Sequence, residues 1–383
     1  MKVEQRQWTQ NKHWQPPHPE LDDADLVFVF GDSGFFRSPA RLAEIKKIYS
    51  KAHIFGCSTA GEIQGAEVYD ESLSTTALRF QHSRLAHAHV FLSQVSGAYE
   101  AGEKLAQALD PKDLVHVFVL SSSLSINGSD LVRGLIKNLP EGVTLTGGIA
   151  GDQARFHETF VISGDTLASD LVAIVGLYGT QLEIHSSCFG GWHPFGPERV
   201  ITKSKGNILY ELDGRPALDL YKVYLGDLAQ ELPDSGLLIP LLLRTKERTQ
   251  DMVRTVLSID EKTKSMYFAG DVPEGASGRF MKVNPDRLIE GALGAAVNCL
   301  PRASSASPEL ALLVSCYGRR KILKQRVEEE VEGVRDVLGS QTVLAGFYSY
   351  GEISARHPSA KSELHNQTMT ITTLREKGDE DAA

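Results

Sequence analysis

The chain has 383 residues, of which 42% are hydrophobic and 23% are charged, and its formal net charge is −9. This length exceeds what one ordinary hydrophobic core serves, so we expect two or three domains. The charge is spread without a basic stripe, which argues against nucleic acid as a partner, and no apolar run reaches the roughly 18 residues of a membrane-spanning helix. Residues 1–20 lack the pattern of a secretion signal, so we expect a cytoplasmic protein.

The first predicted unit contains a strand, a helix and a second strand. The continuous apolar run at 26–30 is typical of a strand buried on both faces. A helix is predicted over 39–50, because Pro39 suits the first position of a helix. A strand over 52–55 follows, and this order is that of a βαβ unit.

Two later stretches repeat this order. The second unit has a predicted strand, loop, helix and strand at 114–120, 121–125, 130–139 and 143–145. The third has a strand, a helix that Gly339 would cap, and a strand at 310–314, 320–338 and 342–344. Further strands are predicted at 73–80, 167–177 and 366–374, and a hairpin joins 252–259 to 266–269. We therefore expect an α/β fold with mixed sheets, built from internally repeated βαβ-type units in two related halves.

A domain boundary is expected near residues 204–225, where Gly206, Gly214 and Pro216 interrupt the pattern before a helix at 217–225. We predict two domains, at 24–219 and 220–375, with flexible ends at 1–23 and 376–383. Residues 301–308, which are rich in Ser, Ala and Pro, are predicted to form an exposed loop.

Each predicted unit ends in a similar glycine-bounded segment, at 56–63, 147–152 and 346–353. Two glycines four or five residues apart let the backbone turn tightly and approach other groups closely. An acidic residue follows the second glycine of each copy: Glu62, Asp152 and Glu352. These glycine segments are either a repeated turn that only the fold requires, or the lining of a shared cleft.

In the second interpretation the cleft binds a polar metabolite such as an amino acid. Backbone amides would take the ligand's carboxylate, and Glu62 or Asp152 would take its ammonium group. The residues predicted to bind it are Gly56, Ser58, Thr59, Gly61, Glu62, Gly151, Asp152, Gly351 and Glu352.

Four segments in the same order resemble those of the FIST sensory family. The first two glycine segments resemble its N-terminal part, residues 191–197 with 209–214 resemble the join between its two parts, and residues 346–353 with 364–368 resemble its C-terminal part. The resemblance covers residues 24–375 and implies a small-ligand sensor in bacterial signal transduction rather than an enzyme. One stand-alone subgroup of this size binds haem. It reports nitric oxide to a partner histidine kinase, or to a cyclic-di-GMP synthase or phosphodiesterase.

A haem cofactor would need an axial ligand with a lone pair, most often a neutral histidine. His193 is the first choice, because Trp192, Pro194 and Phe195 surround it and nearby glycines would let a flat macrocycle approach. The alternative reading of His193 is a turn between domains. The other candidate ligands are His185, His365 and Cys188.

Catalysis is not expected from the motifs present. Cys57 has His53 four residues upstream, but such positions on a strand lie about 13 Å apart, too far for proton transfer. Ser58 is not in the register of a G-x-S-x-G nucleophile, and no P-loop occurs. The cysteines form no C-x-x-C pair, which excludes a zinc knuckle.

Overall fold

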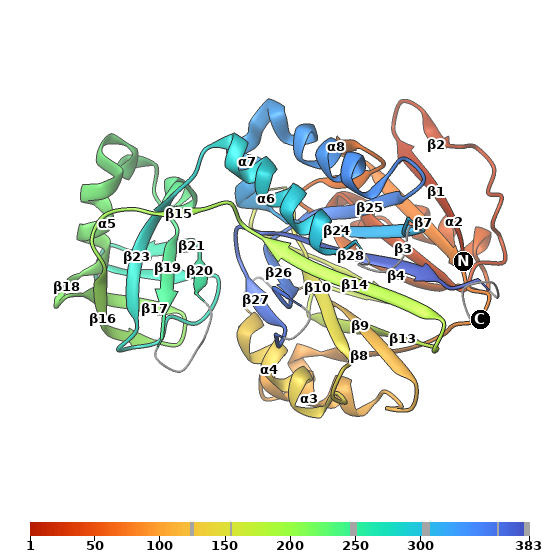
Figure 1. Cartoon of the computed structure of the whole chain (residues 1–383), viewed down its shortest axis with the longest axis horizontal. Coiled ribbons are helices and arrows are strands. Elements are labelled where there is room, and N and C mark those ends of the chain that lie inside the picture. Colours follow the sequence, from red (N-terminus) through yellow and green to blue (C-terminus); the bar gives the residue numbers. More distant parts are fainter. Residues whose placement is uncertain (123–125, 154, 246–250, 301–306, 358–359, 379–383) are drawn as a thin grey trace.

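The structure is a computed structural model that describes residues 1–122, 126–153, 155–245, 251–300, 307–357 and 360–378. Figure 1 shows two lobes of unequal size. The smaller lobe runs from residue 193 to 282, and the segments before and after it form the larger lobe. Among the described residues, no helix combines the length and the apolar character needed to cross a bilayer.

The larger lobe contains three copies of one βαβ unit. In each copy two parallel strands are joined through helix, and a third strand pairs antiparallel with the first. The first copy comprises β3 (Leu26–Gly31), α1 (Ser33–Arg37), α2 (Pro39–Ile48), β4 (His53–Ser58) and β7 (Leu73–Arg79). The second comprises β9 (Leu114–Ser121), α4 (Gly128–Asn138), β10 (Thr144–Ile149) and β13 (Leu171–Tyr178). The third comprises β24 (Leu310–Cys316), α7 (Tyr317–Leu323), α8 (Val327–Leu338), β25 (Val343–Ser349) and β28 (Met369–Glu376).

Each unit also gives a short hairpin to the sheet of another unit. The hairpin β5 (Glu62–Gln64) and β6 (Glu67–Tyr69) joins β25. The hairpin β11 (Val161–Ser163) and β12 (Thr166–Ala168) joins β4. The hairpin β26 (Gly351–Ser354) and β27 (Glu363–His365) joins β10. The three sheets therefore interlock in a cycle.

The outer edges of the three sheets follow the same cycle. After the first unit β8 (Arg84–Phe91) pairs with β13, and after the second β14 (Leu182–Phe189) pairs with β28. The equivalent place beside β7 is taken by β1 (Lys2–Thr9), which also pairs with β2 (His13–Gln15). The three resulting sheets have seven, six and six strands.

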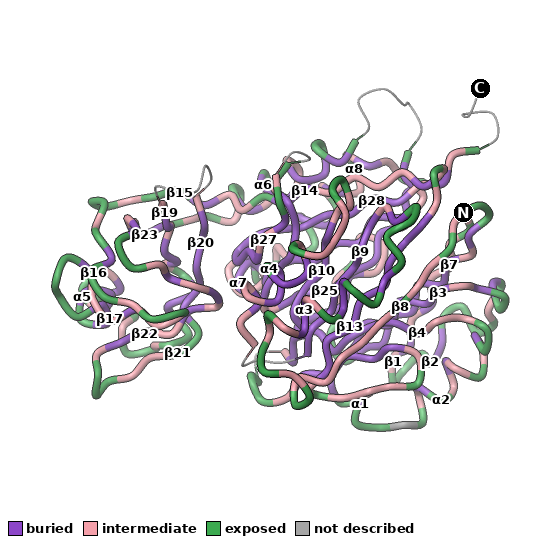
Figure 2. Tube along the Cα trace, turned by 90° about the horizontal axis from the view of Figure 1, so that it is seen from below, coloured by how far each residue is buried: buried purple, intermediate pink, exposed green. Residues whose placement is uncertain are grey.

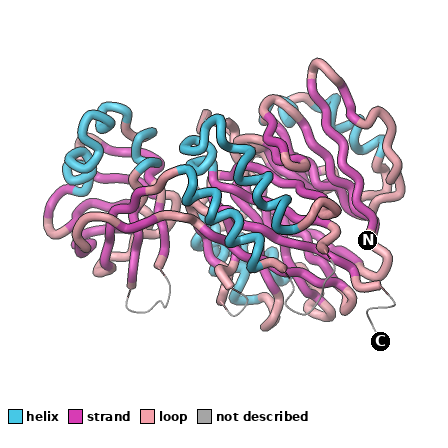
Figure 3. The backbone as a smooth tube through the Cα atoms, turned by 45° about the horizontal axis from the view of Figure 1, so that its top comes forward, coloured by secondary structure: helices cyan, strands magenta, loops and turns pink. Residues whose placement is uncertain are grey.

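The hydrophobic core has an inner part between the three sheets and outer parts under the helices. Figure 2 shows that the strands in the middle of the larger lobe are largely buried, and Figure 3 shows helices lying over its strands. Phe30 of the first unit and Phe347 of the third lie in the inner part with ring centroids 4.8 Å apart. The outer faces are covered by α2 on the first sheet, by α3 (Ala98–Gln107) and α4 on the second, and by α6 (Pro285–Asn298) and α8 on the third. Because both faces are covered, the central strands β3, β9 and β24 are rich in apolar residues.

The smaller lobe is inserted between β14 and α6 and has a core of its own. Its sheet contains β15 (His193–Pro194), β16 (Arg199–Lys205), β17 (Ile208–Leu212), β18 (Arg215–Pro216), β19 (Leu241–Arg244), β20 (Met252–Arg254), β21 (Val256–Asp260), β22 (Ser265–Phe268) and β23 (Ser277–Lys282). Helix α5 (Ala217–Leu225) and the short 3-10 helices η2 (Gly226–Glu231) and η3 (Asp234–Leu238) pack beside that sheet; two further 3-10 turns, η1 (Leu92–Gln94) and η4 (Lys324–Arg326), belong to the larger lobe.

The α/β class with mixed sheets and repeated βαβ units is confirmed. The structure contains three related units, all in the larger lobe, whereas the sequence predicts that the repeated units form two related halves. The predicted flexible end at 1–23 differs from the structure, because β1 pairs along its length with β7 and the Met1 amino group donates to Glu309 at 2.8 Å. In the predicted flexible tail at 376–383, Glu376 is the last residue of β28, and residues 379–383 lie outside the described residues. Residues 123–125 and 301–306, which belong to the two predicted loops, also lie outside the described residues.

Candidate functional site

The three glycine segments meet where the three sheets meet. In each, the amide four positions after the first glycine donates to another segment, and the carbonyl two positions after it accepts. The three bonds are Ala60 N to Tyr348 O at 2.8 Å, Gly151 N to Ser58 O at 2.9 Å and Tyr350 N to Ile149 O at 3.1 Å. This ring of equivalent bonds confirms that the copies occupy equivalent places at the ends of parallel strands.

The first glycine of each segment is required by close backbone packing. A Cβ atom on Gly56, Gly147 or Gly346 would lie 1.8–1.9 Å from a carbonyl oxygen of the neighbouring parallel strand. Gly61 has φ of +130°, as predicted for a residue that only glycine suits, and its Cβ would meet the side chain of Arg320. Gly351 would meet only the side-chain ends of Ile149 and Leu364, so its need for glycine is weaker.

The two glutamates of the glycine segments are buried and held by equivalent hydroxyl groups. Glu62 accepts from Thr59 Oγ1 at 2.5 Å and from Ser72 Oγ at 2.7 Å. Glu352 accepts from Ser349 Oγ at 2.8 Å and from Thr368 Oγ1 at 3.0 Å. Burial raises the pKa of Glu62 to about 8 and that of Glu352 to about 7.

Replacing Glu62 with Gln should therefore raise stability selectively at high pH. The pKa of Glu62 in the folded state lies above the unfolded value of 4.5. The folded protein therefore has its full free energy of unfolding below pH 4.5, where the carboxyl is neutral in both states. This free energy decreases as the pH rises from 4.5 toward 8, because ionisation is favoured only in the unfolded chain. Each unit of pKa difference corresponds to about 1.4 kcal/mol. Urea unfolding of wild type and Glu62→Gln at pH 5, 7 and 9 should give similar free energies at pH 5 and a growing advantage for the variant above it. The same change at exposed Glu141 is the control, and a constant difference between the proteins across this range would contradict the assignment.

Asp152 has a different role, because it organises the loop that follows it. Its carboxylate accepts from the backbone amides of Phe156, His157 and Glu158 at 2.9, 2.8 and 3.0 Å, and from the hydroxyl of Tyr350 at 2.5 Å. These bonds hold Phe156 against Tyr350, with ring centroids 4.5 Å apart and an angle of 16° between the ring planes. Asp152 is thus a structural link between the second and third segments.

The glycine segments do not form the open cleft of the metabolite hypothesis. All nine residues predicted to bind a ligand there are buried: Gly56, Ser58, Thr59, Gly61, Glu62, Gly151, Asp152, Gly351 and Glu352. Their three carboxylates are occupied by hydrogen bonds from within the protein, and none of the nine lines a cavity described below. Two neighbours of these residues, Ser349 and Tyr350, do line one.

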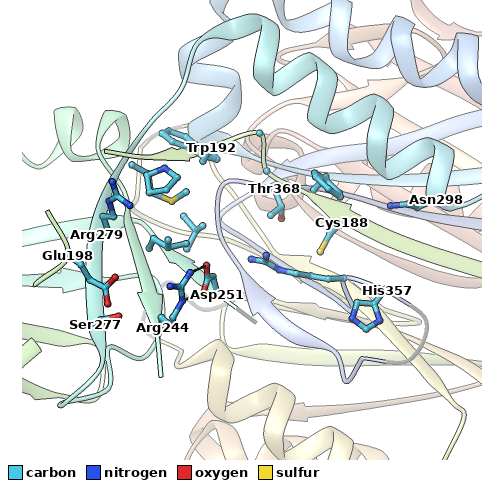
Figure 4. A pocket seen from close by; sticks show the side chains of 18 residues that line it. Cys188, Trp192, Glu198, Arg244, Asp251, Ser277, Arg279, Asn298, His357 and Thr368 are labelled. Atoms are coloured by element: carbon cyan, nitrogen blue, oxygen red, sulfur yellow. Dashed lines mark hydrogen bonds and ion pairs between the residues drawn. The ribbon is translucent and has the colours of Figure 1, made fainter. Parts of the chain in front are cut away.

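A cavity lies between the two lobes and is drawn in Figure 4. Its volume is about 720 Å³, and we call it the inter-lobe cleft. The larger lobe contributes Cys188, Phe189, Asn298, Arg356, His357 and Thr368, and the smaller lobe contributes Pro194, Glu198, Leu242, Arg244, Asp251, Val253, Ser277, Arg279 and Met281. The segment Gly190, Gly191 and Trp192, which joins the lobes, completes the lining.

The walls of the inter-lobe cleft combine apolar surface with charge. Trp192, Val253 and Met281 belong to one small hydrophobic cluster. Arg244 and Asp251 face each other across its edge in a two-point ion pair, with both nitrogen–oxygen distances at 2.8 Å (Figure 4). Arg244 holds the pKa of Asp251 below its usual value. With Arg279 and Arg356 the cleft has three guanidinium groups, which suit carboxylate or phosphate groups of a ligand.

The segment that joins the lobes is fixed by a buried ion pair. Arg319 and Glu330 are both fully buried, with Nη2 and Oε2 2.7 Å apart. Arg319 also donates to the carbonyl oxygens of Gly190 at 2.6 Å and Leu288 at 2.7 Å. The second oxygen of Glu330 accepts from the Tyr348 hydroxyl at 2.6 Å, which connects the joining segment to the third glycine segment.

Of the four predicted haem ligands, only Cys188 lines the inter-lobe cleft, and burial raises the pKa of its thiol to about 12. His193 is exposed on β15 and pairs with Lys282, whereas the next residue, Pro194, pairs with Met281 and lines the cleft together with it. Strand alternation therefore directs His193 away from the cleft.

The other two predicted histidines lie elsewhere in the larger lobe. His185, on β14, lines a separate cavity of about 620 Å³. His365 is buried, with Nε2 2.9 Å from the carbonyl oxygen of Ser354. The sequence did not single out His357, which is exposed and lines the inter-lobe cleft (Figure 4). The pairing of β26 with β10 and with β27 fixes both ends of the segment that contains His357, and these pairings are tertiary features without a local sequence signal. Among the described residues, no group of three or more His, Cys, Asp or Glu side chains is arranged to hold a metal ion.

Comparison with known proteins gives two matches to domain families. Residues 25–215 match the FIST N domain, and residues 217–355 match the FIST C domain. FIST domains are sensory domains that bind small ligands in signal transduction, and they typically occur with kinases or cyclic-di-GMP enzymes.

The curated relatives of this chain are uncharacterised. A protein of Mycobacterium tuberculosis is 25% identical over 339 residues, which is 86% of this chain and 85% of that protein. One of Methanocaldococcus jannaschii is 24% identical over 229 residues, or 55% of this chain and 41% of that protein. Among solved structures, a cyanuric acid hydrolase from A. caulinodans aligns over 98% of this chain and 99% of its own with 8% identity and a TM-score of 0.34, which is too loose a match to indicate fold or activity.

Proposed function

Because the chain belongs to the FIST family, we propose that it is a small-ligand sensor whose ligand binds in the inter-lobe cleft and changes the angle between the lobes. The observation that carries this proposal is the origin of the lining residues, since both lobes and the segment that joins them contribute to one cavity. A ligand that contacts both walls favours the arrangement in which both contacts form. Ligand binding is thereby converted into lobe movement, as signal transduction requires.

Within this proposal, haem is the first ligand to test. The subgroup that the sequence resembles binds haem, and the cleft offers what a porphyrin needs: apolar walls from Trp192, Met281 and Val253, and arginines for its carboxylates. A bound haem iron would supply the place where nitric oxide binds. The chain's own residues would hold the macrocycle between the lobes and exclude water from its apolar part.

The axial ligand is then reassigned by geometry. His357 is the histidine that lines the cleft, and histidine is the commonest axial ligand of haem, so it becomes the first choice. His193 is the second choice, because it lies on the segment next to the cleft but points away from it. Cys188 would have to lose a proton from a buried thiol, which its raised pKa opposes.

Absorbance spectra of purified protein, produced with a supply of haem, test this assignment. We expect an intense haem absorption band near the blue edge of the visible spectrum, and this band should shift when nitric oxide is added. His357→Ala should lose or change this spectrum, while His193→Ala should keep it and exposed His82→Ala should be silent. The opposite result, in which His193→Ala loses the haem spectrum and His357→Ala keeps it, would return the assignment to His193. A wild-type protein without haem would overturn the haem proposal.

The lobe movement itself is measured separately from haem. Small-angle X-ray scattering of protein with and without bound haem should give different radii of gyration. The output partner that we propose is a histidine kinase or a cyclic-di-GMP synthase or phosphodiesterase, because FIST domains occur with such proteins. An identical scattering profile in both states would contradict the lobe-movement mechanism even if haem binds.

A further inference from the structure

Two further cavities lie between the lobes, next to the glycine segments. Their volumes are about 180 and 260 Å³, and they share Phe156, Leu257, Ala269 and Tyr350 in their walls. The larger lobe contributes Phe156, Tyr317 and Tyr350. The smaller lobe contributes Leu257 on β21, Phe268 at the end of β22, and Ala269, which follows it. We call this pair the aromatic cleft.

Three aromatic rings form one wall of the aromatic cleft. Phe156 stacks on Tyr350, and Tyr317 meets both rings edge-on, with centroids 6.2 and 6.0 Å away. Phe156 is 43% exposed although it is large and apolar, and on the opposite wall Leu257 is 38% exposed. Apolar side chains that face each other across a gap and remain exposed mark a binding site.

Phe156 is held in this place at a conformational cost. Its φ of +49° lies in the left-handed region, where a bulky residue is rare. The bonds from Asp152 to the amides of residues 156–158 and to the Tyr350 hydroxyl impose this conformation. The buried Asp152 carboxylate therefore has a use beyond the turn itself: it positions both stacked rings toward the cleft. Backbone strain of this kind is concentrated at functional sites.

The chemistry of the aromatic cleft differs from that of the inter-lobe cleft. No lysine, arginine or histidine is among the described residues that line it, and its only acidic residue, Asp234, is paired with Lys321 at 2.7 Å. Apart from Asp234, the polar side chains among these lining residues are uncharged, and they include Asn127, Asn207, Ser349 and Asn366. The buried Oγ1 of Thr255, in the wall of the smaller cavity, has no hydrogen-bond partner in the described part of the chain. Such a surface favours an uncharged ligand.

We propose that the aromatic cleft is a second ligand site, which takes a small, planar, uncharged aromatic molecule of one or two rings. The ligand would lie against the Phe156–Tyr350 stack and be covered by Leu257 and Ala269 of the smaller lobe. The size is suitable, because an apolar cavity of about 150 Å³ holds benzene, and the smaller cavity here has about 180 Å³. This site does not depend on haem.

The two clefts share a wall. Asn366 lines the aromatic cleft, and Thr368, two residues later, lines the inter-lobe cleft. Both clefts also lie between the same two lobes. An aromatic ligand in one cleft therefore biases the lobe arrangement on which the other depends.

Indole is the test ligand, because it is planar, uncharged and has one N–H donor. Saturation-transfer NMR and calorimetry should detect its binding to wild type, while indole-3-acetate should bind at least tenfold more weakly. Phe156→Ala removes the stacking surface, and Ala269→Leu fills the gap from the opposite lobe; each should weaken indole binding at least tenfold. Tyr99→Ala is the matched control, since Tyr99 is an exposed aromatic residue on α3 that lines neither cleft.

Two variants from different lobes keep the test decisive if one of them folds poorly, and melting curves identify such a case. Indole that binds equally to wild type, Phe156→Ala and Ala269→Leu would overturn the proposal, as would a loss confined to Tyr99→Ala. Absence of binding up to the solubility limit of indole would also overturn it. Indole binding that persists in haem-free protein and depends on Phe156 and Ala269 would support it, whatever the outcome of the haem experiment.

Discussion

Gly147→Ala is expected to abolish the folded state or to lower its free energy of unfolding by at least about 4 kcal/mol. An added Cβ would lie 1.9 Å from the carbonyl oxygen of Val119 on the neighbouring parallel strand, and Gly147 has a φ of +147°. The backbone cannot move to relieve either the close contact or the unfavourable φ, because β9 and β10 are central strands whose faces are covered. Soluble yield and thermal melting by circular dichroism measure the effect.

Two other glycines give matched controls for this substitution. Gly97→Ala adds a methyl group where nothing lies within 4 Å and should melt close to wild type. Gly148→Ala, one residue away, would meet the Cγ1 of Val314 at 2.7 Å, which is a side chain that can shift, so an intermediate effect is expected. A Gly147→Ala protein that melts like Gly97→Ala would show that the ring of glycine segments tolerates displacement.

The second large effect is expected at the buried ion pair. Arg319→Met leaves the Glu330 carboxylate buried without its cation and removes the donors to the carbonyl groups of Gly190 and Leu288. Breaking such a pair from one side costs about 3–5 kcal/mol. Urea unfolding should show this loss, and the double variant Arg319→Met with Glu330→Met should be more stable than Arg319→Met alone, because no charge is then left unpaired.

Arg326→Met provides the surface comparison. Arg326 also pairs with acidic side chains, at 2.8 Å from Glu329 and from Asp286, but it is partly exposed. Its loss should leave the free energy of unfolding close to that of the wild type, since exposed pairs contribute little. Equal losses in the Arg319 and Arg326 variants would mean that burial of the Arg319 pair has no energetic consequence.

The parts of the fold that follow from local pattern were predictable. The apolar runs of β3, β9 and β24 are typical of strands with both faces covered, and each is followed by a helix and a glycine segment. The exchange of hairpins was not predictable, because β5, β11 and β26 are three or four residues long and their partners lie in other units. The predicted helix at 320–338 is interrupted between α7 and α8, where Lys324 has a φ of +53°.

The candidate sites were less accessible to sequence reasoning, for a physical reason. The repeated acids Glu62 and Glu352 were predicted to bind a ligand. In the structure each accepts a hydrogen bond from the hydroxyl group three residues earlier, Thr59 or Ser349, and so stabilises a turn. The cleft residues Arg244, Met281 and His357 belong to three distant segments, and only tertiary structure brings them together. Phe156 carries no motif at all, since its position depends on the unusual backbone conformation that Asp152 imposes.

The interlocking of the sheets decides which pieces of the gene could be expressed alone. The match to the FIST N domain ends at residue 215, inside the smaller lobe, between β17 and α5. A fragment that ended there would lack β25 and β28, so the hairpin β5–β6 and the strand β14 would have bare edges, and bare edges pair with other chains. A fragment from residue 217 would likewise lack β10, to which β26 belongs. The two family domains are thus divisions of the sequence. A fragment able to form all three sheets must contain both domains.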